Sequence, residues 1–349
     1  MFYSRIMSSL LDLSSSWTAR SVVVLAVIGA LVINRRPRKS LSVDDKSANP
    51  LTPTSSIFGV LLSPVGRGHS SEDTSIPADP KPLQVATEEV GGKETAVVKV
   101  KQPYDALLVL DVEGTCMSGT TFDYPNEIIE WPVCLMRWKD KDEEGKASQL
   151  EIVAEFRSFV KPTWRPTLSQ FCTQLTGITQ EQVDTAPTFS EVMKMFSEFL
   201  SANGLVHPGT GKRLERFCWC SDGPFDVRDF VVKQCFISKM TMPSWITGDI
   251  MDVRKIVSNL SYGRERDRRK TSTFTRRISL NIPAQLKFLG LPPFEGRQHS
   301  GIDDTRNIAR IISELGRRGV RLEPNYVIHP RRRWQWMGKP GEILEEYIT

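Results

Sequence analysis

The stretch "ALLVLDVEGT", Ala106 to Thr115, decides the fold class of this chain. It is an unbroken apolar run that ends in two acids and a glycine, and such a run is typical of a strand buried on both faces of an α/β sheet. Strand alternation places Asp111 and Glu113 on the same face as Leu107 and Val109. The stretch therefore predicts two neighbouring carboxylates at the carboxyl end of a central strand, where open α/β sheets bind ligands.

The two carboxylates, Asp111 and Glu113, carry like charges. Each raises the pKa of the other unless a positive group holds both ionised, and a divalent cation does this well. The alternative interpretation is that the strand has ended and that its acids lie in solvent. The spacing alone leaves both interpretations open.

The stretch "GRQHSGIDDTRNIARI", residues 296–311, predicts a helix after Gly301. Steps of three and four residues from Asp304 reach an apolar stripe formed by Ile308, Ile311 and Leu315. The same steps from Asp303 reach the polar residues Arg306, Asn307, Arg310 and Glu314. We therefore expect Asp303 in water and Asp304 at the edge of the core, where an unpaired carboxylate costs several kcal/mol. A metal ion would offset this cost, and His299 lies in a loop that could reach the same site.

The stretch "FCWCSDGPFDVRDFVVKQCF", residues 217–236, offers a further acid from the middle of the chain. It predicts a strand to Cys220, a turn and then a helix from Phe225 onward. Asp222 suits the turn or a helix cap, whereas Asp226 in the first helical turn could point inward. Spacing hardly separates these two acids, and a third, Asp229, is expected to face solvent.

Composition limits the class of protein. The chain has 349 residues, 40% of them hydrophobic, which supports a single catalytic domain with extensions. A net charge of +5 and a pI near 8.8 do not by themselves require nucleic acid. The six cysteines show no CxxC pairs, which argues against a disulfide framework or a zinc ribbon and favours buried thiols in a reducing compartment. For the "CWC" of Cys218 and Cys220 we prefer alternate positions in a strand over a metal clip.

The first 40 residues differ from the rest of the chain. An apolar helical face formed by Phe2, Ile6, Leu10, Leu13 and Trp17 resembles an import presequence. Residues 21–33 form an apolar run of about 20 Å as a helix, short of the roughly 30 Å of a bilayer core. The run fits a short membrane anchor with the rest of the chain on the cytosolic side, a signal-peptide core or a mitochondrial presequence. Residues 41–102, rich in Pro and Ser, are expected to be a flexible linker.

Five motifs together resemble one family. They are "LDVEGT", "FDYPNEIIEWPVCLM", "LTGITQEQVDTAPTF", "SDGPFDVRDF" and "HSGIDDTRNIARI", between roughly Tyr104 and Leu322. In this order they resemble the DEDDh exonucleases, and more narrowly the 3′–5′ exoribonucleases that trim histone mRNA tails, small interfering RNA and 5.8S ribosomal RNA. The resemblance implies an RNase H-like α/β fold over residues 103–325, with a central five-stranded mixed sheet flanked by helices.

The resemblance also implies the roles of individual residues. The metal ligands would be Asp111, Glu113, Asp226 and Asp304, so the family pattern favours Asp226 over Asp222. The general base would be His299. The residues that contact the terminal nucleotide would be Thr115, Thr176, Gly177 and Ile178, although Gly177 also fits a helix C-cap.

The implied chemistry is hydrolysis with two Mg²⁺ ions, or Mn²⁺, about 3.5–4 Å apart. One ion would lower the pKa of a water and the other would stabilise the departing oxygen, while His299 takes the water's proton. The substrate would be RNA with a single-stranded 3′ end and the product a nucleoside 5′-monophosphate, with no organic cofactor and a monomeric nuclease domain. Two alternatives remain, a 3′–5′ DNA exonuclease and a membrane-tethered RNA-binding protein without catalysis.

Two basic segments are open to several interpretations. Residues 261–279 could be a solvated surface loop or an RNA-backbone contact. The tail at 326–349 contains "HPRRRWQWMGK", whose arginines and tryptophans suit stacking on RNA bases, a membrane interface or docking onto the domain.

Overall fold

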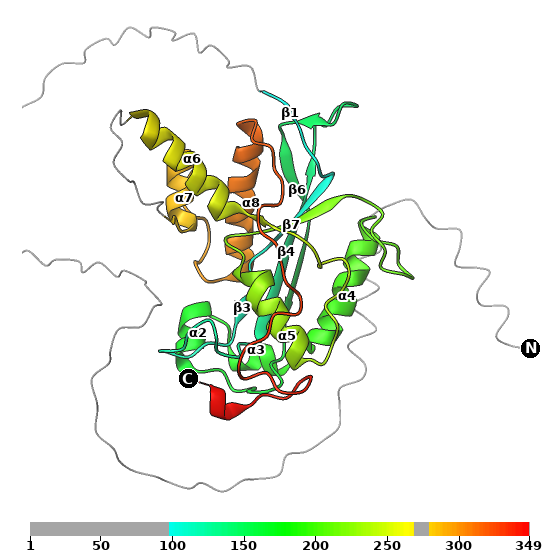
Figure 1. Cartoon of the computed structure of the whole chain (residues 1–349), viewed down its shortest axis with the longest axis vertical. Coiled ribbons are helices and arrows are strands. Elements are labelled where there is room, and N and C mark those ends of the chain that lie inside the picture. The colour runs from blue at the N-terminus through cyan, green and yellow to red at the C-terminus, as the bar shows by residue number, and fades with distance from the viewer. Residues whose placement is uncertain (1–97, 269–278, 349) are drawn as a thin grey trace, which may run out of the picture. The chain divides into compact units, whose positions relative to one another are not determined.

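The structure is a computed structural model and describes residues 98–268 and 279–348. A mixed sheet forms its centre (Figure 1). The strands of this sheet are β2 (Ala106–Leu110), β3 (Glu113–Gly114), β4 (Ile128–Trp138), β6 (Leu150–Phe159), β7 (Phe217–Ser221) and β8 (Met251–Asp252). A separate pair of short strands joins β1 (Val100–Lys101) to β5 (Lys146–Ala147).

Across the sheet the order is β6, β4, β2, β7 and β8. Strand β3 continues β2, because both pair with β4 in one register: Leu110 lies opposite Val133, and Glu113 lies opposite Glu130. The six described strands therefore occupy five positions. Strands β2, β7 and β8 are parallel, whereas β4 is antiparallel to both β2 and β6. This confirms the expected five-stranded mixed sheet.

Strand β2 is buried on both faces, as its unbroken apolar run predicts. Leu108 and Leu110 belong to the core on one face of the sheet. Leu107 and Val109 belong to the core on the other face, together with Cys218 and Cys220 of β7. The two cysteines thus take alternate positions in a buried strand, and all six cysteines of the chain are free and buried.

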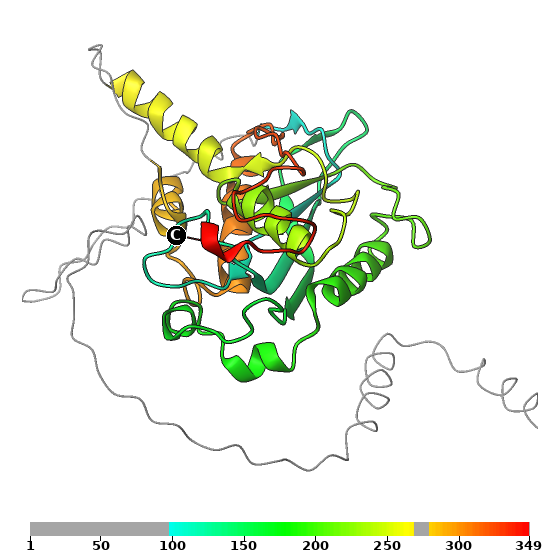
Figure 2. The ribbon, with the colours of Figure 1, turned by 60° about the horizontal axis from the view of Figure 1, so that its bottom comes forward.

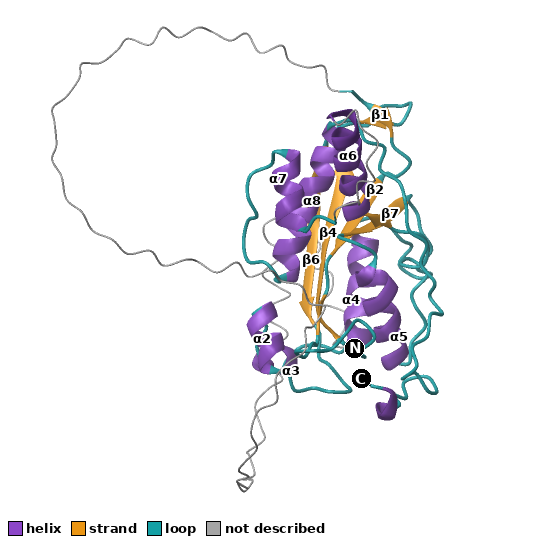
Figure 3. Cartoon of the chain, turned by 60° about the vertical axis from the view of Figure 1, so that its left-hand side comes forward, coloured by secondary structure: helices purple, strands orange, loops and turns teal. Residues whose placement is uncertain are grey.

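Helices cover both faces of the sheet (Figure 3). The helical elements are α2 (Gln170–Thr176), α3 (Gln180–Asp184), α4 (Phe189–Ala202), the π-helix η1 (Asp226–Val231), α5 (Val232–Ile237), α6 (Val253–Arg268), α7 (Ile282–Leu289), α8 (Gly301–Arg317) and the short 3₁₀ helix η2 (Glu345–Tyr347). Helices α6, α7 and α8 pack on the face of Leu107 and Val109. Elements α4, η1 and α5 pack on the opposite face.

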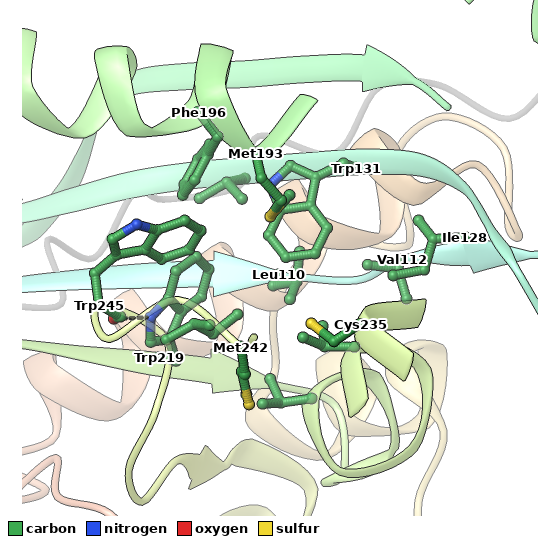
Figure 4. Close-up of a cluster of buried hydrophobic side chains, with 14 of the residues drawn as sticks. Leu110, Val112, Ile128, Trp131, Met193, Phe196, Trp219, Cys235, Met242 and Trp245 are labelled. Atoms are coloured by element: carbon green, nitrogen blue, oxygen red, sulfur yellow. Dashed lines mark hydrogen bonds between the residues drawn. The ribbon is translucent and has the colours of Figure 1, made fainter. Parts of the chain in front are cut away.

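Aromatic side chains fill the core beneath α4 (Figure 4). The indole of Trp131 meets the rings of Phe196 and Trp219 edge to face, with ring centroids 5.8 and 6.3 Å apart. The indole nitrogen of Trp219 donates to the carbonyl of Trp245 over 2.9 Å, so this buried polar group is satisfied. The packing holds β7, and with it the start of η1, against β2.

The C-terminal segment docks onto the domain and runs beside α5 (Figures 1 and 2). Trp334 and Trp336 are 8% and 2% exposed and belong to the core on the α4 side. The indole nitrogen of Trp336 donates to the carbonyl of Asp123. In this conformation neither ring has a free face for an RNA base or a lipid, so docking is the interpretation that the structure supports.

Strand β1 lies inside the segment expected to be a linker, residues 41–102. Gln102 is buried and bridges two later backbone groups, since its side chain donates to the carbonyl of Val320 and accepts from the amide of Leu322. Residues 100–102 thus take part in the described structure, although they fall within the expected linker. Long-range hydrogen bonds of this kind leave no local pattern in the sequence.

Several expectations concern residues outside the described ranges. The presequence-like segment, the apolar run 21–33 and most of the expected linker lie there. Within the described ranges, no helix combines the length and the apolar character that crossing a membrane requires. The basic segment 261–279 starts as a continuation of α6 to Arg268 and not as a loop, and its backbone from 269 to 278 is outside the described ranges.

Candidate active site

Three predicted metal ligands converge beyond the end of β2. One carboxylate oxygen from each of Asp111, Glu113 and Asp304 lies within 4.8 Å of the other two. Asp111 and Glu113 follow β2 on the face that α8 covers, and Asp304 lies in the first turn of α8. The structure therefore joins residues that are almost 200 positions apart in the sequence.

The fourth predicted ligand, Asp226, lies beside this cluster. It is the first residue of the π-helix η1, and its Oδ1 accepts a hydrogen bond of 2.9 Å from the backbone amide of Val112. That amide directly follows Asp111, so the Asp226 carboxylate is held next to the Asp111 carboxylate. Single π-helical turns are frequent at functional sites, and nothing in the sequence predicted this one.

Burial and mutual repulsion raise the pKa values of the four acids. Burial is the main cause at Asp111, and the carboxylates of Asp226, Asp304 and Glu113 add to it, so its pKa lies well above 3.8. The pKa of Glu113 is raised well above 4.5, also mainly by burial. Burial raises the pKa values of Asp226 and Asp304 from 3.8 to about 7, against the effect of backbone hydrogen bonds. Raised pKa values are expected for buried carboxylates that lie close to one another.

The donor set fits a hard divalent cation. The Oδ2 atom of Asp304 is buried and has no hydrogen-bond partner. Buried carboxylate oxygens are normally paired, and a carboxylate cluster of this kind is what Mg²⁺, Mn²⁺ or Ca²⁺ prefers. The observation agrees with the predicted ligands, and it does not select among these ions.

Helix α8 can bring Asp304 close to β2 because it begins with a glycine. A Cβ atom on Gly301 would lie 2.7 Å from the carbonyl oxygen of Asp111 and 2.9 Å from Cγ of Pro132. The amide of Gly301 donates to Oε2 of Glu130 over 3.1 Å, and Oε1 of Glu130 pairs with Arg157 over 2.7 Å. A buried glutamate from β4 thus satisfies one of the free amides at the start of α8.

The expectation of one buried and one solvent-exposed face of α8 is only partly correct. Ile308, Ile311 and Leu315 are fully buried, as predicted. The helix face that carries Asp303 is not uniformly exposed to solvent, because Asp303 is half-buried and Asn307 is fully buried. The reason is that the segment before α8 folds back over this face, where the Asn307 amide donates to the carbonyl of Glu295 over 2.8 Å.

A cavity of about 700 Å³ opens beside the acids. Its lining includes Asp111, Asp304 and His299, together with the amino-terminal end of α7. His299 precedes α8, is exposed and has a left-handed φ of 61°. Partial burial of the ring and the guanidinium of Arg297 lower the pKa of its imidazole. The ring therefore lies at the cavity with the acids, as the loop position suggested.

A buried polar network that the sequence did not reveal lines the same cavity. Arg254 of α6 forms two hydrogen bonds to Asp222, of 3.2 and 2.5 Å, and Gln285 of α7 donates to the same carboxylate over 2.6 Å. Asp222 thus joins α6 and α7 to the end of β7 and is not merely a turn residue. An arginine just after a short strand carries no sequence signal for this contact.

The residues expected to contact a nucleotide are placed as follows. Gly177 ends α2 in the left-handed conformation with φ of 75°, which bears out the C-cap interpretation. The side chains of Thr176 and Ile178 are buried, and the Thr176 hydroxyl donates to the carbonyl of Cys172 over 2.9 Å. The hydroxyl of Thr115 accepts from the amide of Glu127. Any contact with a substrate would therefore involve mainly the backbone at Thr176 to Ile178.

The expectation that Asp229 faces solvent is wrong. Asp229 is 1% exposed and is paired with Arg228 and with Arg332 of the C-terminal segment. The sequence missed this because Arg332 is distant in the chain and reaches Asp229 only after the tail has docked.

Comparisons with known proteins agree with this geometry. Residues 108–212 match the family model described as Exonuclease. The chain is 34% identical over 245 residues to the 3′-5′ exonuclease eri1 of Schizosaccharomyces pombe, which covers 66% of this chain and 72% of the yeast protein. It is 31% identical to the human 3′-5′ exoribonuclease 1 over 65% of this chain, but spans only 56% of the human protein.

Solved structures show the same fold. The nuclease domain of 3′hExo, a DEDDh family member bound to rAMP, superposes with a TM-score of 0.53 at 31% identity, over 66% of this chain and 100% of that domain. A 3′-exonuclease structure described as 3′-end specific recognition of the histone mRNA stem-loop gives a TM-score of 0.54 at 27% identity, over 69% of this chain and 75% of that one. With its convergent carboxylates, its mixed sheet and these similarities, the chain belongs to the eri1-like family of 3′–5′ exoribonucleases of the DEDDh type.

Proposed function

We propose that this chain removes nucleotides from the single-stranded 3′ end of RNA by metal-assisted hydrolysis and releases nucleoside 5′-monophosphates. The observation that carries the proposal is the convergence of Asp111, Glu113 and Asp304 within 4.8 Å, beside a cavity that His299 also lines. Phosphodiester hydrolysis requires charge neutralisation and a proton acceptor next to each other, and this arrangement can supply both.

In the proposed mechanism two divalent ions would be held by Asp111, Glu113, Asp226 and Asp304, with Mg²⁺ as the first candidate and Mn²⁺ as the second. The ions, when bound, lower the pKa of a water and offset the charge of the scissile phosphodiester. The four carboxylates must be deprotonated to bind cations, and their raised pKa values make this deprotonation part of metal binding.

His299 is the proposed general base. A lowered pKa leaves its imidazole neutral near physiological pH, so that a ring nitrogen can accept the proton of the attacking water. The left-handed backbone of His299 and its place on the cavity wall support this role, because non-glycine residues in that conformation concentrate at active sites.

RNA is proposed as the substrate on the strength of the relatives. The human relative is described as an exoribonuclease, and the 3′hExo nuclease domain was solved with rAMP. The backbone at Thr176, Gly177 and Ile178, with Thr115, is proposed to contact the terminal nucleotide. Trimming of the 3′ ends of ribosomal RNA or small RNAs is the corresponding biological role.

The test uses the purified full chain, Mg²⁺ and an RNA labelled at its 5′ end that carries a single-stranded 3′ overhang. Progressive shortening and release of nucleoside 5′-monophosphate are expected, together with loss of both in an Asp111→Asn variant. A DNA strand of the same sequence distinguishes the two nuclease alternatives. Preferential degradation of DNA would show that DNA and not RNA is the substrate. Equal activity of the wild type and the Asp111→Asn variant would refute the proposed catalytic site.

A further inference from the structure

We propose that Arg297 is a positioning residue for His299: its guanidinium fixes the turn that carries the proposed base to the carboxyl end of α2. The inference rests on the proposed function and deepens it. It assigns a role to a residue outside the four carboxylates of the proposed metal site.

The turn before α8 is strained and therefore needs a restraint. His299 has a φ of 61° and Gly296 a φ of 86°, so two of the five residues from 296 to 300 are left-handed. A side chain at residue 299 does not favour this conformation, which persists only where the surroundings determine it. The turn is also exposed, so burial contributes little to holding its shape.

Arg297 supplies hydrogen bonds on both sides of the turn. Its Nη1 donates to the carbonyl of His299 over 3.1 Å, and its Nη2 donates to the carbonyls of Gln174 and Leu175, each over 2.9 Å. The backbone amide of Arg297 donates to Oδ2 of Asp303 over 3.0 Å. One planar side chain thus spans from the last turn of α2 to the backbone of the proposed base.

The position of the guanidinium depends on a glycine. A Cβ atom on Gly177 would lie 3.0 Å from Cζ of Arg297 and 3.1 Å from its Nη1. The guanidinium therefore lies against the segment proposed to contact the terminal nucleotide. Arg297 thus connects this segment to the His299 turn. A shift of either one changes the direction in which the imidazole points.

Lysine cannot reproduce this arrangement, because an ammonium group lacks the planar fork that donates in two directions at once. The contact therefore depends on the shape of the side chain as well as on its charge. An Arg297→Lys variant should recover only part of what Arg297→Ala loses.

The decisive measurement is a double-mutant cycle on RNA degradation at saturating Mg²⁺. If Arg297 acts through His299, Arg297→Ala should lower kcat by about 10–100-fold, the range for residues that orient a catalytic group, with a smaller change in KM. The Arg297→Ala, His299→Ala double variant should be no slower than His299→Ala alone. Free guanidinium ion at millimolar concentration should partly restore the Arg297→Ala variant but not the double variant.

Arg317→Ala is the matched control, since Arg317 is an exposed arginine at the far end of α8 that pairs with Glu314. It should keep wild-type kcat with and without guanidinium, and thermal melts should show that every variant is folded. Wild-type kcat in Arg297→Ala, or losses that multiply in the double variant, would overturn the positioning role. An inactive wild type would instead refute the proposed function, so the two failures are distinguishable.

Discussion

Ionising each carboxylate at the proposed metal site costs more free energy in the folded chain than in the unfolded one. Asp226 and Asp304 have pKa values of about 7 in the fold and about 3.8 when unfolded. The folded protein therefore holds protons that the unfolded chain releases. The proposed metal binding accounts for this cost, because the same crowding favours divalent cations.

The first prediction concerns pH and metal. Because these two pKa values are raised, their favourable contribution is fully present below about pH 4 and is lost as the pH rises through about 7. Metal-free protein should thus have a lower Tm at about pH 8 than at about pH 6, and added Mg²⁺ should raise the Tm more at the higher pH. Thermal unfolding with EDTA or with Mg²⁺ at both pH values measures this. An equal gain at both pH values would contradict it.

The second prediction contrasts the adjacent aspartates of α8. Asp304→Asn removes a repelled charge, so the metal-free variant should have a higher Tm than wild type at about pH 8, while RNA degradation falls at least about 100-fold. Asp303→Asn keeps an oxygen that can accept from the Arg297 amide, so its effect on activity should be much smaller. Melting curves and initial rates of both variants provide the test. Similar rates in the two would argue against Asp304 as a ligand.

At the scale of elements, the site depends on how the start of α8 is held. The residue at the N-cap position of α8, Ser300, makes no side-chain capping hydrogen bond. Glu130 of β4 instead accepts from the Gly301 amide, and it is fully buried beside Glu113. The sheet therefore positions the helix that carries Asp304.

The third prediction follows from this replacement of the cap. Glu130→Ala leaves the Gly301 amide and the Arg157 guanidinium without this partner, and should lower the free energy of unfolding by about 1–3 kcal/mol. Ser300→Ala should change it by less than about 0.5 kcal/mol, although helix-cap preferences alone would rank the two the other way. Urea unfolding of both variants decides, and a larger loss for Ser300→Ala would refute the capping role of Glu130.

At the scale of the whole molecule, the described C-terminal segment is part of the nuclease fold. Trp336 is 2% exposed, and Arg332 forms an ion pair of 2.6 Å with Asp229 of η1. Since Asp226 begins the same π-helix, the tail braces the element that supplies the fourth carboxylate.

The fourth prediction uses two adjacent arginines of this segment. Arg332→Ala removes a partner of the buried Asp229 and should destabilise the protein by about 1 kcal/mol, since Arg228 still pairs with that carboxylate and Arg332 is partly exposed. Arg331 is exposed, and Arg331→Ala should change stability by less than about 0.5 kcal/mol. Comparison of their Tm values tests the brace. Equal losses would show that the pair with Asp229 does not stabilise the tail.

The sequence by itself determined the features that follow from local periodicity. The apolar run at 106–110 implied a strand buried on both faces, and the steps from Asp304 to Ile308 and Ile311 implied the buried stripe of α8. Both follow from one repeat length along the chain, two residues in a strand and about 3.6 in a helix. The family motifs favoured Asp226 over Asp222 as the proposed fourth ligand, a choice that spacing had left open.

Only the tertiary structure decided which distant groups meet. The pairing of Asp229 with Arg332, the burial of Asn307 and Trp336, and the contacts of Arg297 with α2 all join segments that no repeat relates. The physical reason is that burial and hydrogen bonding depend on what the fold places opposite a residue. A polar residue on an expected wet face becomes buried when a loop from elsewhere folds over it.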